Sequence, residues 1–250
     1  MNPKEELCQR AVEILRGATS VFVMTGAGVS AESGIPTFRG TDGLWKNYSV
    51  QDLATPHAFK RDPGLVWDWY RWRQNIILKA QPNPAHYAIV ELERMFERFL
   101  LLTQNVDNLH YRAGSRKVLE IHGNIFRVRC SECGKENPFT CIDESIHELP
   151  RCDCGGLLRP DVVWFGEAIP SRVWAESLDY LNTAQVAVFC GTSGVVWPAA
   201  AIPGLAKELR IRTIEINLEP TPFSRTVDVS IMTRAGETLP RIVNALSAAE

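Results

Sequence analysis

Residues 21–45 read VFVMTGAGVSAESGIPTFRGTDGLW, and the rest of the chain is organised around them. The stretch opens within a short apolar run, residues 20–25, that is typical of a buried parallel strand. Small residues follow at the G-x-G-x-x-A spacing that lets a dinucleotide pyrophosphate approach the backbone. A tight turn between a strand and a helix would explain the same short pattern. The residues concerned are Gly26, Ala27, Gly28 and Ala31.

The residues after this turn do not continue as those of a dehydrogenase would. A dehydrogenase runs into a long helix and a second strand, with an acidic ribose ligand about 20 residues further on. Here any such helix is interrupted by Gly34, Pro36, Gly40 and Gly43. We therefore expect a loop that folds over a ligand, with Phe38 and Arg39 as its working side chains.

The composition is that of a globular protein with one large domain and room for a small insert. The 250 residues are 45% hydrophobic and 22% charged, with a formal net charge of −2. This charge argues against nucleic-acid binding, and no apolar run reaches the roughly 20 residues of a membrane span. The N-terminal segment is amphipathic and carries two early glutamates, which is unlike a signal peptide. We therefore expect a cytoplasmic monomer that binds neither nucleic acid nor membrane.

The pattern of apolar residues predicts an α/β fold built on a parallel sheet. Strands are predicted at residues 20–25, 99–103, 186–190, 213–217 and, near the end, 227–231. Helices are predicted at residues 5–16, 63–80, 85–97 and from Thr238 onward. Ligands of such sheets bind beyond the carboxyl ends of the strands, where most of the polar motifs of this chain stand.

Four of the seven cysteines form two closely spaced pairs. Eighteen residues separate Cys130-x-x-Cys133 from Cys152-x-Cys154, which is typical of a structural tetrahedral zinc site. The polar segment between the pairs has too little apolar mass to fold without such a link. Because a single residue separates the second pair, Cys141 is an alternative ligand, and a metal-free set of thiols is the other interpretation.

Together these motifs resemble those of the sirtuins, which are NAD-dependent protein-lysine deacylases. The resemblance begins with GAGVSAESGIPTFRG and continues in family order over most of the chain. It includes QNVDNLH (residues 104–110), IHGN (121–124), VVWFGE (162–167), GTS (191–193) and NLE (217–219).

The resemblance implies a single sirtuin-type domain, residues 1–250, with a Rossmann-like doubly wound parallel sheet. The Rossmann-like core is expected at about residues 1–45, 85–129 and 155–250. A cofactor-loop and helical module is expected at about residues 26–84, and a small zinc-ribbon insert at about residues 130–158.

The resemblance also implies NAD as a co-substrate and one structural zinc per chain. Asn105 and Asp107 are expected to hold the nicotinamide ribose and amide, and Ala235 to touch the adenine through its backbone. The full expected NAD site is Gly26, Ala27, Gly28, Ala31, Phe38, Arg39, Trp45, Gln104, Asn105, Asp107, Gly191, Thr192, Ser193, Asn217, Leu218, Glu219 and Ala235. The expected zinc ligands are Cys130, Cys133, Cys152 and Cys154.

His122 and Asn105 are the catalytic residues that the resemblance implies. Taken alone, a histidine such as His122 is more often structural than catalytic. In the sirtuin reaction the acyl oxygen attacks the ribose of NAD as nicotinamide leaves, and a base near neutral pKa then deprotonates a ribose hydroxyl. Neutral imidazole suits that step, while Asn105 is expected to orient water.

The implied substrate is an acylated lysine in an extended peptide, and the products are free lysine, nicotinamide and 2′-O-acyl-ADP-ribose. Residues 162–166 resemble the segment that pairs with the peptide as an added strand, although a buried strand would carry the same residues. Tyr70 and Arg73 are three residues apart, so they share one face of their predicted helix.

This Tyr-x-x-Arg pair, with the small Ala54, resembles the sirtuin branch that removes succinyl, malonyl and glutaryl groups. Arg73 would bind the terminal carboxylate; an exposed arginine on a helix is the alternative. The expected substrate residues are Ala54, Tyr70, Arg73, Val163, Trp164, Phe165 and Gly166. A general deacetylase, a protein ADP-ribosyltransferase and a non-catalytic NAD or zinc-ribbon module are the remaining functional alternatives.

Overall fold

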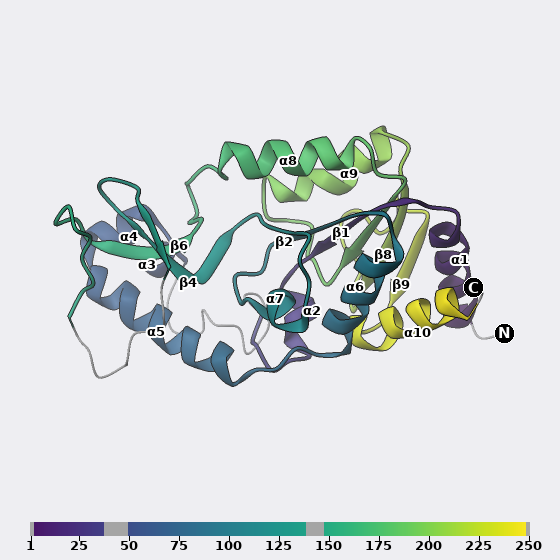
Figure 1. Ribbon diagram of the computed structural model, residues 1–250, viewed down its shortest axis with the longest axis horizontal. Coiled ribbons are helices and arrows are strands. Elements are labelled where there is room, and N and C mark those ends of the chain that lie inside the picture. Colours follow the sequence, from purple (N-terminus) through teal and green to yellow (C-terminus); the bar gives the residue numbers. More distant parts are fainter. Residues whose placement is uncertain (1–2, 38–49, 139–147, 249–250) are drawn as a thin grey trace.

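The computed structural model describes residues 3–37, 50–138 and 148–248 of the chain. Within them, six parallel strands form one sheet in the order β3-β2-β1-β7-β8-β9 (Figure 1). The strands are β1 (Ser20–Thr25), β2 (Arg98–Thr103), β3 (Val118–Glu120), β7 (Val186–Cys190), β8 (Arg212–Asn217) and β9 (Val229–Met232). The order reverses direction at β1, which confirms the predicted doubly wound α/β fold.

Helices cover both faces of this sheet. On one face α1 (Pro3–Arg16), α6 (Pro84–Met95) and α10 (Ala235–Ser247) pack together. On the other face lie α8 (Ser171–Leu181) and α9 (Ile202–Glu208), side by side along the top of Figure 1. Every residue of β1 and β7 is buried, as expected for strands covered on both faces.

A smaller lobe is built on an antiparallel sheet in the order β5-β4-β6. Its elements are α3 (Val50–Leu53), α4 (Pro56–Arg61), α5 (Pro63–Lys79), β4 (Gly123–Cys130), β5 (Glu136–Pro138) and β6 (Leu158–Val162). The helices and the sheet share one core, in which Trp67, Tyr70 and Trp164 are the largest fully buried side chains. The helical module and the zinc insert, which the sequence predicted separately, are therefore parts of one lobe.

The boundary of this lobe differs from the predicted one. The sequence placed residues up to 129 in the doubly wound core, but β4 begins at Gly123 and pairs only within the small sheet. Gly123 adopts a φ of 79° and lies against the carbonyl of Asp161 in β6, an approach that a Cβ atom would block. The chain therefore leaves the core directly after His122.

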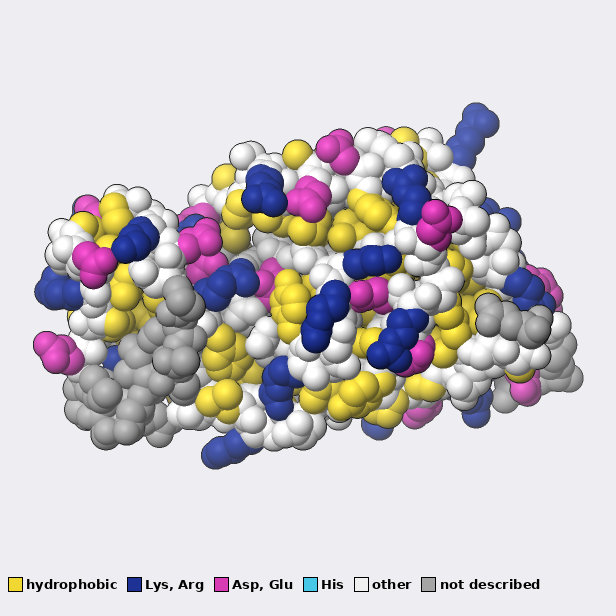
Figure 2. All heavy atoms as spheres, in the orientation of Figure 1, with side chains coloured by type: hydrophobic (Ala, Val, Ile, Leu, Met, Phe, Trp, Pro, Cys, Tyr) yellow, Lys and Arg dark blue, Asp and Glu magenta, His cyan; other side chains and the backbone are white. Residues whose placement is uncertain are grey.

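Three short helices follow strands or loops at the edge of the main sheet. They are α2 (Ala27–Ala31), α7 (Leu109–Ala113) and the 3-10 helix η1 (Ala199–Ala201). α10 begins at Ala235, three residues before the predicted start at Thr238. None of the described helices is both long and apolar enough to cross a membrane. In Figure 2, acidic and basic side chains are interspersed over the larger lobe, as the net charge of −2 suggests.

Candidate active site

The polar motifs that the sequence singled out meet at the carboxyl edge of the main sheet. Residues 26–28 follow β1, residues 104–107 follow β2 and residues 191–193 follow β7, while residues 217–219 begin at the last residue of β8. Since β1 lies between β2 and β7, the first three motifs are neighbours in space. The structure therefore brings most of the expected NAD-binding residues to one edge.

The glycines of the first loop are explained by a close contact with the loop after β7. A Cβ atom at Gly26 would lie 2.8 Å from the carbonyl oxygen of Gly191, and one at Gly28 would lie 2.8 Å from its Cα. Gly28 also donates its N–H to the Gly191 carbonyl at 2.8 Å. Any larger residue at these positions would push the two loops apart.

Asn105, Asp107 and Ser30 form a buried hydrogen-bonded cluster beyond the carboxyl ends of β1 and β2. Ser30 donates to Asp107 Oδ2 at 2.6 Å, and Asn105 Nδ2 donates to Ser30 Oγ and to the Gly26 carbonyl, both at 3.0 Å. Burial raises the pKa of Asp107, although the bond from Ser30 acts in the opposite direction. Sequence reasoning missed Ser30; its place inside the GAGVSAESG motif was the available signal.

Gln104, Thr192 and Asn217 connect three strand ends. Gln104 Nε2 donates to Thr192 Oγ1 at 2.7 Å, and Asn217 Nδ2 donates to the Thr192 carbonyl at 2.8 Å. The neighbouring Ser193, Leu218 and Glu219 are exposed at the rim of this edge. At the far end, Ala235 is the first residue of α10.

Four of the positions that the sequence analysis named are not covered by the structure. Phe38, Arg39 and Trp45, which are expected at the NAD site, lie outside the described residues, as does the alternative zinc ligand Cys141. Ala31 is described: it is the last residue of α2, and Glu32 after it accepts a bond from the Gly236 N–H at 2.9 Å. That bond links the glycine loop to the start of α10.

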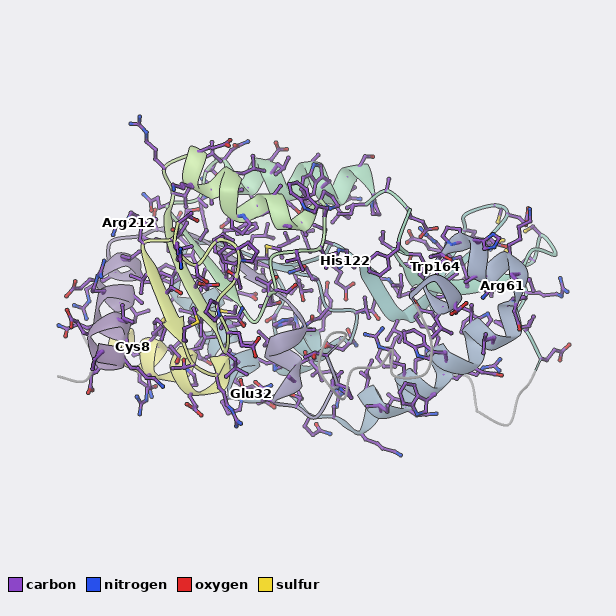
Figure 3. All side chains as sticks on the ribbon, turned by 180° about the vertical axis from the view of Figure 1, so that it is seen from behind. Cys8, Glu32, Arg61, His122, Trp164 and Arg212 are labelled. Carbon is purple, nitrogen blue, oxygen red and sulfur yellow. The ribbon has the colours of Figure 1, made fainter. Side chains whose placement is uncertain are left out.

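His122 stands between the two lobes, with Trp164 on the side of the small lobe (Figure 3). Its Nδ1 lies 3.1 Å from the carbonyl oxygen of Gln104, and its own carbonyl accepts the Val163 N–H at 2.9 Å. Burial lowers the pKa of His122, although the bond to Gln104 acts to raise it. The imidazole is therefore neutral at pH 7 and suited to accept a proton.

The expected acyl-binding residues are largely buried in the small lobe. Tyr70 accepts a hydrogen bond from Trp164 Nε1 at 2.8 Å, and Arg73 is 5% exposed. The alternative of an exposed arginine at position 73 is therefore wrong. Arg73 lines a pocket together with Ala27, Ser30, Ile35, Pro36, Asn105, Val106 and Asp107.

The segment expected to pair with a peptide, residues 162–166, begins at Val162, the last residue of β6, and continues just beyond the strand. The Val163 and Phe165 N–H groups bond to the carbonyls of His122 and Ala54, and the Trp164 N–H bonds to Glu167 Oε2. These N–H groups are satisfied within the protein, so an added peptide strand would have to use the Gly166 N–H or carbonyl oxygens. The Phe165 side chain is exposed.

The four cysteine sulfurs of the predicted zinc site gather at the tip of the small lobe. All four lie within 4.8 Å of one another, with Cys130–Cys154 at 3.5 Å and Cys133–Cys152 at 3.7 Å. Four thiolates around a zinc ion at about 2.3 Å would be about 3.8 Å apart, whereas a disulfide would bring two sulfurs to about 2.05 Å. The donor set therefore fits a structural zinc.

Turns on both sides place these sulfurs. The N–H groups of Glu132 and Cys133 point at Cys130 Sγ at 3.4 and 3.5 Å, and the bond from Cys133 is the largest cause that lowers the pKa of Cys130 to about 6. A tight turn after Cys152, closed by the Gly155 N–H at 2.8 Å, brings the second pair round despite its single intervening residue. Gly155 has a φ of 89°.

Two buried histidines near the site were not predicted. His110 Nε2 lies 2.9 Å from Thr25 Oγ1 at the end of β1, and its ring is 4.8 Å from that of His86 in α6. Burial lowers the pKa of His86 to about 4 and that of His110 well below its usual value. The QNVDNLH motif contains His110, so its polarity after β2 was the available signal.

Comparison with known proteins identifies the family of this chain. Residues 26–198 match the model of the Sir2 family. NAD-dependent protein deacylase 2 of Pyrobaculum aerophilum is 52% identical over 233 residues, which are 92% of each chain. The NAD-dependent protein deacylase of Thermococcus kodakarensis is 52% identical over 241 residues, 93% of each chain.

Solved structures agree. A Sir2 homologue in complex with NAD has a TM-score of 0.91 at 44% identity, covering 96% of this chain and 94% of that one. A mutant homologue in complex with 2′-O-acetyl ADP ribose has a TM-score of 0.90 at 44% identity, over 96% and 97%. Sir2Af2 bound to a myristoylated histone peptide has a TM-score of 0.80 at 36% identity, over 98% of each. The family model matches more than half of the 250 residues, and the two relatives share 52% sequence identity with this chain over more than nine tenths of its length. This chain therefore belongs to the Sir2 family, the sirtuins.

Proposed function

We propose that this chain is an NAD-dependent protein-lysine deacylase that removes succinyl and malonyl groups as well as acetyl groups. The observation that carries the proposal is the pocket in which the buried Arg73 and the cluster of Asn105 and Asp107 line the same space. An acidic acyl group and the nicotinamide ribose would meet there. The deacylase activity itself is supported by the relatives named above and by the homologue bound to NAD.

The side chains at the sheet edge suit the sirtuin reaction. NAD supplies the ribose to which the acyl group is transferred, with nicotinamide as the leaving group. His122 takes a proton from a ribose hydroxyl through Nε2, because Nδ1 already donates to Gln104. The Nδ2 of Asn105 is fully used by Gly26 and Ser30, so its Oδ1 remains to accept a hydrogen bond from water or a ribose hydroxyl.

Arg73 provides the acidic-acyl preference. Burial lowers its pKa to about 10, which outweighs the raising effects of Tyr70 and Asp107, so it stays charged at neutral pH. A carboxylate on the acyl chain offsets the lost solvation of this guanidinium and matches its planar pair of donors. An acetyl group fits the same pocket without using that interaction.

A preference for long aliphatic acyl groups is the second candidate. It is motivated by Sir2Af2, which is bound to a myristoylated histone peptide. Ile35, Pro36 and Val106 give the pocket an apolar wall that such a chain would contact. The charge of Arg73 in the same pocket argues against it, because an alkyl chain can neither accept a hydrogen bond from the guanidinium nor balance its charge.

Turnover of one peptide sequence with acetyl, succinyl, malonyl or myristoyl lysine separates these functions. Nicotinamide, free lysine and acyl-ADP-ribose are measured by mass spectrometry with NAD present. The proposal expects kcat/KM for the succinyl or malonyl peptide to equal or exceed that for the acetyl peptide. A dominant myristoyl activity supports the second candidate. Transfer of ADP-ribose from NAD to protein, without release of free lysine, identifies an ADP-ribosyltransferase. The absence of nicotinamide release identifies a non-catalytic binding module.

A further inference from the structure

Tyr70 and Trp164 meet in the core of the small lobe. The indole Nε1–H of Trp164 lies 2.8 Å from the Tyr70 hydroxyl oxygen, and the two residues are 2% and 1% exposed. Their rings are tilted by 41° with centroids 6.5 Å apart. Trp164 extends from the segment after β6, on the small-lobe side of His122 (Figure 3). This contact therefore connects the peptide-side segment with the helix that carries the expected acyl-binding pair.

The direction of this hydrogen bond is fixed by the chemistry of the two groups. An indole nitrogen can only donate, so the Tyr70 oxygen accepts and its own proton has to be donated elsewhere. No group among the described residues accepts that proton. Burial raises the pKa of Tyr70, against the lowering effect of Arg73, so the phenol keeps its proton at neutral pH. The side of the Tyr70 oxygen that faces Trp164 is therefore occupied by the indole N–H, and the Tyr70 O–H has to point away from Trp164.

Trp164 is itself held on two further sides. Its backbone N–H donates to Glu167 Oε2 at 2.8 Å, and the guanidinium carbon of Arg159 lies 3.2 Å from the centroid of its indole ring. Arg159 in turn binds both carboxylate oxygens of Glu167, at 2.5 and 3.0 Å. A ring fixed in this way restricts the directions in which the Tyr70 hydroxyl can turn.

We propose that Trp164 is a positioning residue for acyl selectivity: by occupying the acceptor side of the Tyr70 hydroxyl, it directs the Tyr70 O–H to the carboxylate of an acidic acyl group. The inference rests on the proposed function and deepens it, since it assigns selectivity to a residue outside the Tyr-x-x-Arg pair. An acetyl or alkyl group has no carboxylate for this O–H, so the arrangement favours only acidic acyl groups.

Trp164→Phe tests the inference, because it keeps an aromatic ring beside Arg159 and removes the indole N–H. We expect the ratio of kcat/KM for the succinyl-lysine peptide to that for the acetyl-lysine peptide to fall about 3- to 10-fold, the cost of one misdirected hydrogen bond. The fall should come mainly from the KM of the succinyl peptide. In the Tyr70→Phe background, Trp164→Phe should lower the ratio no further.

Trp67→Phe is the matched control. Trp67 is also fully buried in the small-lobe core, and its indole donates to the Leu158 carbonyl at 2.9 Å instead of to Tyr70. This variant loses an indole hydrogen bond of similar length and should keep the wild-type ratio. An equal fall in both tryptophan variants would mean that loss of packing, not positioning, lowers the ratio, and would overturn the inference.

A spectroscopic measurement on the wild-type protein tests the inference even if Trp164→Phe does not fold. The indole N–H resonance of Trp164, assigned through its displacement in Tyr70→Phe, should shift when the succinyl peptide binds and not when the acetyl peptide binds. The reason is that a hydroxyl that donates to a carboxylate becomes a stronger acceptor. Identical responses to the two peptides would overturn the inference.

Arg73→Met distinguishes failure of this inference from failure of the proposed function. If Arg73→Met lowers the succinyl-to-acetyl ratio and Trp164→Phe leaves it unchanged, the inference alone is wrong. If the wild-type protein does not turn over the succinyl peptide, or Arg73→Met leaves the ratio unchanged, the proposed acidic-acyl preference is wrong and the inference fails with it.

Discussion

His122 Nδ1 lies 3.1 Å from the carbonyl oxygen of Gln104, the first residue after β2. A carbonyl only accepts, so this contact places the imidazole proton on Nδ1 and leaves the lone pair on Nε2. The side chain of Gln104 also donates to Thr192 at 2.7 Å. One residue thus sets the tautomer of the expected base and links it to the loop after β7.

His122→Ala should lower deacylation about 10²- to 10⁴-fold, because the ribose hydroxyl loses the group that accepts its proton. NAD affinity, measured by calorimetry, should change far less, since the expected NAD contacts lie mainly on other residues. His57→Ala, which changes an exposed histidine of α4, serves as the control and should keep its activity. Near wild-type turnover by His122→Ala would remove this residue from the mechanism.

Loss of the thiolate cluster should affect stability and not selectivity. We expect about one zinc per chain by elemental analysis of reduced protein, and loss of that zinc in Cys152→Ser with a lower unfolding temperature. The cysteine outside the cluster in α1, Cys8, gives the control Cys8→Ser, which should retain the metal. Full zinc in Cys152→Ser together with its loss in Cys141→Ser would show that Cys141 is a ligand.

Buried histidines should make the fold less stable at mildly acidic pH. The pKa of His86 is lowered to about 4 in the folded chain, against about 6.5 when unfolded, so the unfolded state takes up more protons between these values. The free energy of unfolding should therefore fall as pH decreases from 6.5 towards 4, by up to about 1.4 kcal/mol per pH unit from this residue.

Urea unfolding of the wild-type protein and of His86→Gln at pH 7, 6 and 5 measures this contribution. The variant should show a shallower loss of stability, with His110 still contributing because its pKa is also lowered. His57→Gln, at an exposed position, should leave the slope unchanged. Parallel pH dependences for the wild type and His86→Gln would contradict the prediction.

The sequence predicted the sheet better than it predicted the small lobe. Strands such as β1 and β7 are continuous apolar runs, so their position and their burial follow from the residues alone. β4 was assigned to the wrong lobe because its pairing depends on β6, which is 28 residues further along the chain from Cys130 to Leu158. Such non-local antiparallel pairing leaves no local signal.

The candidate site shows the same limit. The resemblance to the sirtuins indicated Asn105, Asp107 and His122, but it could not indicate that Ser30 binds both Asn105 and Asp107. The bond between Trp164 and Tyr70 joins residues 94 positions apart and depends on how the two parts of the small lobe pack. The type of a residue can be read from the sequence, whereas its partner requires the fold.

Arg73→Met should reduce kcat/KM for the succinyl-lysine peptide about 10- to 100-fold, because the acyl carboxylate loses its hydrogen bonds to a charged group. The reduction should be much smaller for the acetyl-lysine peptide. Tyr70→Phe, which keeps the ring and removes one hydroxyl, should cost less. High salt should weaken binding of the succinyl peptide more than that of the acetyl peptide, because only the former uses a pair of opposite charges.

Arg71→Met is the matched control for this last prediction. Arg71 is also buried on α5, but it binds the Asp68 carboxylate and the Glu148 carbonyl and does not line the pocket. Its loss should lower stability and leave the succinyl-to-acetyl ratio unchanged. If Arg73→Met reduces turnover of both peptides equally, as a loss of packing would, Arg73 supports the fold and the enzyme is a general deacylase.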